Sequence, residues 1–173
     1  FPDARPDDGV LELGIVTEVF GRDPHYDVTV CAQRRTSPVS GSGFTINTSA
    51  GLDAVDRAET MIVPGYEDVD GTVSTIALDA LRAAHARRAR LVSICTGAFA
   101  LAATGLLDGR PATTHWRWSH ELQARYPRVN VISNRLFVDD GDILTSAGVT
   151  TGIDLCLHII RRDHGAHVAR HIA

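Results

Sequence analysis

Short apolar runs alternate along the chain with longer stretches in which apolar residues recur every three or four positions. The runs predict buried strands at residues 26–32, 60–66 and 91–95. The longer stretches predict amphipathic helices at residues 9–21, 74–91, 96–107, 120–127 and 148–165. Strands that alternate with helices indicate an α/β fold, with a mostly parallel sheet flanked by helices on both faces.

Other stretches give weaker signals. Residues 130–148 predict two strands joined at Asp139-Asp140-Gly141-Asp142, a turn sequence, whereas residues 43–51 favour a short strand or hairpin. Residues 111–116 fit a strand or a loop, and the Pro- and Asp-rich residues 1–8 read as loop. Because such a fold normally opens with a strand, we expect that strand to lie outside this chain. The helical spacing predicts that Leu11, Ile76 and Ile153 face the core.

Composition narrows the class of protein. A chain of 173 residues fits one domain, and a net charge of −4 makes a poor DNA-binding surface. No apolar run approaches the roughly 20 residues of a membrane helix. The three widely spaced cysteines favour reduced thiols in a cytoplasmic protein over a disulfide framework. Neither CxxC nor HExxH spacing occurs, so we expect no metal and no cofactor.

The stretch RLVSICTGAFALAATGLLDG, residues 90–109, carries the candidate chemistry. It places Cys95 where a buried strand turns directly into a helix, at the carboxyl edge of the sheet where ligands bind in open α/β folds. A helix N-terminus favours an anion, so this position predicts a thiolate on a nucleophile elbow. The alternative is that Cys95 is a small buried apolar residue.

The wider sequence resembles a known family. The blocks CTGAFALAATGLLDGRPATTHW and DDGDILTSAGVTTGIDLCLHIIRRDHG are similar to those of the ThiJ/PfpI superfamily, whose fold is flavodoxin-like and related to class I glutamine amidotransferases. With LELGIVTEVFG and IVPGY, they resemble the N-terminal domain of AraC-type transcriptional regulators. This resemblance implies one domain over residues 1–173 that dimerises and senses a small molecule. It also implies a C-terminal helix-turn-helix domain, absent from this chain, for binding DNA.

The resemblance also implies roles for individual residues. Cys95 matches the elbow cysteine, Glu12 the acidic residue that approaches its sulfur, and His115 a histidine near the cysteine in several members. A carboxyl group that donates to sulfur must keep its proton; alternatively, Glu12 is a favourable first-turn carboxylate and His115 a core residue. The expected ligand-binding residues are Gly65 and Thr96, through backbone N–H groups that form an oxyanion nest, together with Gly97 and Trp116.

Departures from the family patterns separate enzyme from sensor. Thr96 follows the elbow cysteine where PfpI-type peptidases have histidine, and the His-x-Glu pair of amidotransferases is missing, since Ile159 and Ile160 follow His158. A ligand-sensing domain therefore leads. The alternative is a cysteine-dependent enzyme of isonitrile hydratase or glyoxalase type that uses Cys95 with Glu12. A third hypothesis is redox sensing by Cys95.

Overall fold

A four-stranded sheet forms the centre of the molecule. The computed structural model describes residues 9–33, 36–37, 45–48, 50–66 and 68–173. In the sheet, β3 (Thr60–Val63), β4 (Arg90–Ile94) and β8 (Ile143–Ser146) run parallel, and β7 (Phe137–Asp139) pairs antiparallel with β8. The mostly parallel sheet predicted from the alternating pattern is confirmed.

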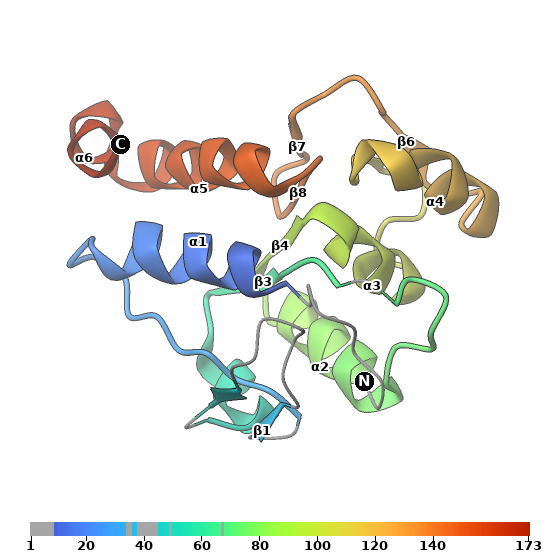
Figure 1. Cartoon of the computed structure of the whole chain (residues 1–173), viewed down its shortest axis with the longest axis horizontal. Helices are drawn as coiled ribbons and strands as arrows, with labels where there is room; N and C mark the ends of the chain where they lie inside the picture. Colours follow the sequence, from blue (N-terminus) through green and yellow to red (C-terminus); the bar gives the residue numbers. More distant parts are fainter. Residues whose placement is uncertain (1–8, 34–35, 38–44, 49, 67) are drawn as a thin grey trace.

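Helices cover both faces of this sheet, as predicted (Figure 1). On one face, α1 (Val10–Gly21) packs beside α5 (Val149–His164), and α6 (Ala166–Ile172) follows. On the other face lie α2 (Thr75–Ala86), α3 (Ala98–Ala103) and α4 (Ser119–Arg125). A hydrophobic core lies on each face of the sheet, and successive residues of β4 point into the two cores alternately. Leu91 packs in the core with α2 and α3, whereas Val92 packs in the core with α1 and α5.

Short elements complete the fold. The strands β1 (Thr36–Ser37) and β2 (Ile46–Asn47) pair antiparallel, and β5 (Pro111–Ala112) pairs parallel with β6 (Asn130–Val131). Short 3-10 helices occur at η1 (Leu52–Arg57), η2 (Cys95–Gly97) and η3 (Trp116–Trp118). The predictions for residues 1–8, and for residues 43, 44 and 49 of the weak hairpin, fall outside the described part of the chain.

Three sequence predictions need correction. Residues 26–32 form no strand, because their only ladder contact among described residues is a bridge from Cys31 to Ala50. The helix predicted over residues 74–91 ends at Ala86, since the chain turns at Arg88, which has φ +67°. The helix predicted over residues 96–107 begins with η2 and ends at Ala103, before a turn at Gly105 with φ +82°.

Several apolar side chains predicted to face the core lie on the surface. Leu11 is 61% exposed, Ile76 56% and Ile153 39%. The helical spacing was misleading for α1 because apolar residues surround this helix, and its inward face includes Glu12. Burial of a glutamate while a leucine stays exposed is unusual, and it makes the start of α1 a candidate for the functional site.

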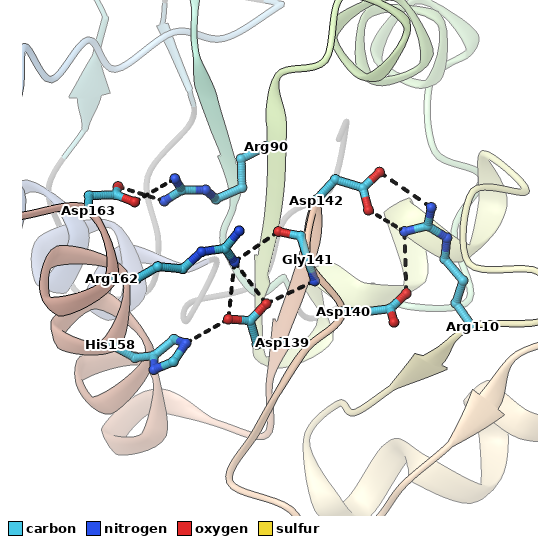
Figure 2. Close-up of polar contacts among 9 residues, drawn as sticks. All are labelled: Arg90, Arg110, Asp139, Asp140, Gly141, Asp142, His158, Arg162 and Asp163. Atoms are coloured by element: carbon cyan, nitrogen blue, oxygen red, sulfur yellow. Dashed lines mark hydrogen bonds and ion pairs between the residues drawn. The ribbon is translucent and has the colours of Figure 1, made fainter.

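An ion-pair network lies at the amino edge of the sheet (Figure 2). Arg90 at the start of β4 forms a bidentate pair with Asp163 of α5, at 2.8 Å for each contact. In the β7–β8 turn, Asp139 accepts from Arg162 and bonds His158, and Arg110 donates to Asp142. The predicted turn at residues 139–142 is therefore confirmed. Among the described helices, none is long and apolar enough to span a membrane.

Candidate functional site

Cys95 lies at the carboxyl edge of the sheet in a strained backbone conformation. It follows β4 directly, begins η2 and has φ +57°, a left-handed value that residues other than glycine seldom adopt. Its side chain is buried. Gly97 permits the sharp turn, because a Cβ there would collide with the carbonyl oxygen of Val63. This strand–turn–helix geometry fits the predicted elbow, and a nucleophilic role for Cys95 stays a prediction.

Gly65 brings the candidate residues together. A Cβ placed on Gly65 would lie 2.9 Å from Glu12 Oε1, 3.0 Å from Cys95 Cβ and 3.3 Å from Thr96 Oγ1. Four of the residues predicted from sequence therefore meet at one point, although they come from α1, the end of β3 and the elbow. No side chain fits at Gly65 without displacing one of them.

The surroundings of Cys95 favour its neutral thiol over the thiolate. Burial raises its pKa to about 11, and the Glu12 carboxyl group, which is hydrogen-bonded to the sulfur, adds to this rise. The Thr96 N–H and hydroxyl groups oppose it less strongly. The expectation of a thiolate at the elbow is therefore wrong, because desolvation and a neighbouring carboxyl group outweigh the donors of η2.

The Thr96 hydroxyl group fixes the elbow to the turn after β3. Its oxygen accepts a hydrogen bond from the Tyr66 N–H at 2.7 Å and lies 2.6 Å from the Tyr66 carbonyl oxygen, to which it donates. This contact holds Gly65 against Cys95. The oxyanion role of the Gly65 and Thr96 N–H groups stays a prediction.

His115 lies beside the start of α5, within electrostatic reach of Glu12, and Trp116 lies next to it on the surface. The His115 Cδ2 atom lies 3.6 Å from a Cβ placed on Gly148, at the start of α5. Burial and the nearby Arg117 lower the pKa of His115, and the charge of Glu12 acts in the opposite direction. The Trp116 ring is 5.7 Å from the His115 ring and is 72% exposed. Its ligand-binding role stays a prediction.

Sequence reasoning missed Thr114. Its buried hydroxyl group donates a 2.9 Å hydrogen bond to the carbonyl oxygen of Cys95 and so supports the strained residue from the loop after β5. The available signal was the pair Thr113-Thr114 next to His115, where two polar residues follow an apolar strand. Nothing local to that pair reveals that it faces the elbow.

A separate cavity of about 250 Å³ lies on the α3–α4 side of Tyr66. Three aromatic rings and one guanidinium group are among the walls of this cavity, which include Tyr66, Val69, Phe99, Arg125 and Tyr126. Cys95 does not line it. Within the described ranges, no group of three or more His, Cys, Asp or Glu side chains is placed to hold a metal ion.

Comparison with known proteins identifies regulators and one enzyme among the relatives. The chain is 35% identical to the HTH-type transcriptional regulator GbdR of Pseudomonas aeruginosa over 164 residues. The matched region covers 95% of this chain and 44% of that protein. It is 31% identical over 161 residues to isonitrile hydratase of Pseudomonas putida, covering 92% of this chain and 69% of the enzyme. The chain thus spans less than half the length of the GbdR regulator.

Solved structures share the fold. An AraC family transcriptional regulator from Pseudomonas putida superposes with a TM-score of 0.82 at 19% identity, over 98% of this chain and 93% of that one. Drosophila melanogaster DJ-1beta superposes with a TM-score of 0.83 at 21% identity, over 98% and 91%. The family model for the DJ-1/PfpI family matches residues 9–162, so the chain belongs to the DJ-1/PfpI family.

Proposed function

We propose that this chain is the ligand-sensing domain of a cytoplasmic transcriptional regulator, with a small molecule bound next to Cys95. The observation that carries the proposal is the meeting of Glu12, Gly65 and Cys95 at the buried carboxyl edge of the sheet, where burial raises the pKa of the Cys95 thiol to about 11. A nucleophilic or redox-active cysteine is a thiolate, and this site suppresses the thiolate. It retains a buried, rigid set of polar groups at the sheet edge where α/β folds bind ligands.

DNA binding belongs to a part of the protein outside this chain. GbdR is named an HTH-type regulator, and the matched region covers 44% of its length. A C-terminal helix-turn-helix domain would supply the basic surface that a domain of net charge −4 lacks. In this arrangement, ligand binding at Cys95 would control a domain attached after α6.

Self-association is part of the same proposal. Leu11 in the first turn of α1 is 61% exposed, and we place the dimer contact at this side chain. Sedimentation analysis should show a dimer that Leu11→Asp weakens, whereas Ile76→Asp, 56% exposed on α2, should leave it intact. A wild-type chain that stays monomeric at all concentrations would contradict dimerisation.

Ligand binding can be tested by thermal unfolding with a panel of small carboxylates, amides, amines and isonitriles. A compound that binds should raise Tm. The rise should be smaller for Cys95→Ala and unchanged for Cys31→Ala, a thiol outside the site. If no compound class raises Tm, or if both cysteine variants respond like wild type, ligand sensing at Cys95 is wrong.

The second candidate is an isonitrile hydratase. It is favoured by the 31% identity to such an enzyme and by the contact between Glu12 and the Cys95 sulfur. Glu12 could accept the thiol proton as Cys95 attacks the isonitrile carbon and return it to that carbon, which gives a thioimidate. Water would then hydrolyse the thioimidate to a formamide and the free thiol. Formation of N-cyclohexylformamide from cyclohexyl isonitrile, lost in Cys95→Ala, would establish this activity in place of pure sensing.

A further inference from the structure

The first turn of α5 presents hydrogen-bond donors beside the Cys95 site. Gly148 precedes this helix and has no side chain to cap it, and its own N–H donates to the Thr151 hydroxyl group at 2.7 Å. Its carbonyl oxygen accepts the Gly152 N–H at 2.8 Å, but the N–H groups of the first turn have no partner within an α-helix. The helix is 16 residues long with no acidic residue in its first turn, so the positive end of its dipole is not neutralised there.

A buried hydroxyl group faces this turn from the sheet. Ser146 ends β8, is 0% exposed, and its Oγ atom has no hydrogen-bond partner in the described part of the chain. Ser146 pairs with Ile94 in the parallel ladder, so both side chains leave the sheet on the same face. A Cβ placed on Gly152 would lie 3.0 Å from Ile94 Cγ2, so the start of α5 covers that face. A hydroxyl buried there needs a partner.

His115 supplies a third donor. The Arg117 N–H donates to His115 Nδ1 at 3.4 Å, so the neutral imidazole carries its proton on Nε2. The adjacent ring atom, Cδ2, is the one that lies 3.6 Å from a Cβ placed on Gly148. The Nε2 edge of the ring is therefore turned toward the start of α5, even when the imidazole is uncharged.

We propose that the first turn of α5, Ser146 and His115 form a subsite for the carboxylate group of a small-molecule ligand. Every group at the subsite donates a hydrogen bond, and a carboxylate only accepts. This inference rests on the proposed function, because it names the chemical class of the ligand that the domain senses.

Titration of the ¹⁵N-labelled chain with propionate tests the subsite, and propionamide serves as a neutral control of the same shape. Propionate should shift the backbone amide signals of residues 149–151 and the His115 ring signals, whereas propionamide should not. Equal binding of both compounds would overturn the assignment, because it removes the role of charge. Shifts confined to the turn at Thr96 and Gly97 would also overturn it.

Two serine variants separate binding from structure. Ser146→Ala should raise the Kd for propionate roughly tenfold, the usual effect of a hydrogen bond to a charged group. It should not lower Tm, since the hydroxyl group has no partner to lose among described residues. Ser119→Ala is the matched control, because Ser119 is also buried without a partner there but begins α4. An equal loss in both variants would contradict the subsite.

The outcome also distinguishes this inference from the proposed function. If propionate fails to bind while another compound shifts the amides of Gly65 and Thr96, the carboxylate subsite is wrong and ligand sensing stands. If no compound shifts either group of amides, both are wrong.

Discussion

Thr114 holds Cys95 in a conformation that its own backbone disfavours. The Thr114 hydroxyl group donates to the Cys95 carbonyl oxygen at 2.9 Å, and Cys95 has φ +57°. A left-handed residue other than glycine costs about 1–3 kcal/mol and persists only where its surroundings fix it. Because Thr114 precedes His115 in the chain, the same contact also ties the histidine loop to the elbow.

Thr114→Val should therefore lower the free energy of unfolding by about 1–3 kcal/mol, the cost of leaving a buried carbonyl oxygen without its donor. Valine keeps the shape of threonine, so packing should be preserved. Urea unfolding measures the change, and Thr72→Val in an exposed loop is the control. Equal stability of the Thr114 variant and wild type would show that the hydrogen bond does not support the elbow.

Cys95→Gly should be at least as stable as Cys95→Ala. Glycine normally costs about 0.5–1 kcal/mol relative to alanine, but it adopts positive φ without strain. At Cys95, the glycine variant should therefore be at least as stable as the alanine variant. At Ala100 within α3, glycine should instead be less stable than the wild-type alanine. Urea unfolding of the three variants decides, and a Cys95→Gly variant clearly less stable than Cys95→Ala would contradict the strain.

Glu12→Gln should lower the pKa of the Cys95 thiol. Burial is the larger cause of the rise to about 11 and remains in the variant, so the pKa should fall without returning to its ordinary value of 9.0. The rate of Cys95 alkylation by iodoacetamide against pH, followed by peptide mass spectrometry, measures this pKa. Glu18→Gln on the exposed face of α1 is the control. An unchanged alkylation profile in Glu12→Gln would exclude contact between the carboxyl group and the thiol.

Acid should weaken the amino-edge network through Asp142. Hydrogen bonds from Arg110 lower the pKa of Asp142 from 3.8 to about 2, and the bond to His85 acts in the same direction. A lowered carboxyl pKa gives stability that is complete above 3.8 and is lost as pH falls through about 2. Arg110→Gln should flatten the dependence of unfolding free energy on pH in this window, measured by urea unfolding. Arg128→Gln, whose pair with Asp108 is exposed, should retain the wild-type slope.

The sequence predicted most of the layered fold because buried strands and amphipathic helices carry local patterns. It failed at residues 26–32, where strand formation depends on a neighbouring strand, and at Leu11, where helical spacing does not reveal which face is covered. Proximity of Glu12, Gly65 and Cys95 was predicted only through the family resemblance. The Cys95 pKa was mispredicted, because burial and the Glu12 contact are tertiary effects.

Thr114 and Ser146 could not be found from the sequence for a related reason. Both are single hydroxyl residues in ordinary strand or loop contexts, and their importance comes from what the fold places opposite them. The elbow was visible because its strand–turn–helix pattern is local. Its polar surroundings come from segments far apart along the chain.

The most direct test of ligand sensing at Cys95 is the fate of a compound that binds there. Proton NMR of each compound that raises Tm, held with the chain for a day, records binding by saturation transfer and turnover by new signals. We expect saturation transfer that weakens in Cys95→Ala and a compound that is recovered unchanged. Conversion of the compound by wild type, abolished in Cys95→Ala, would contradict the sensor and identify an enzyme.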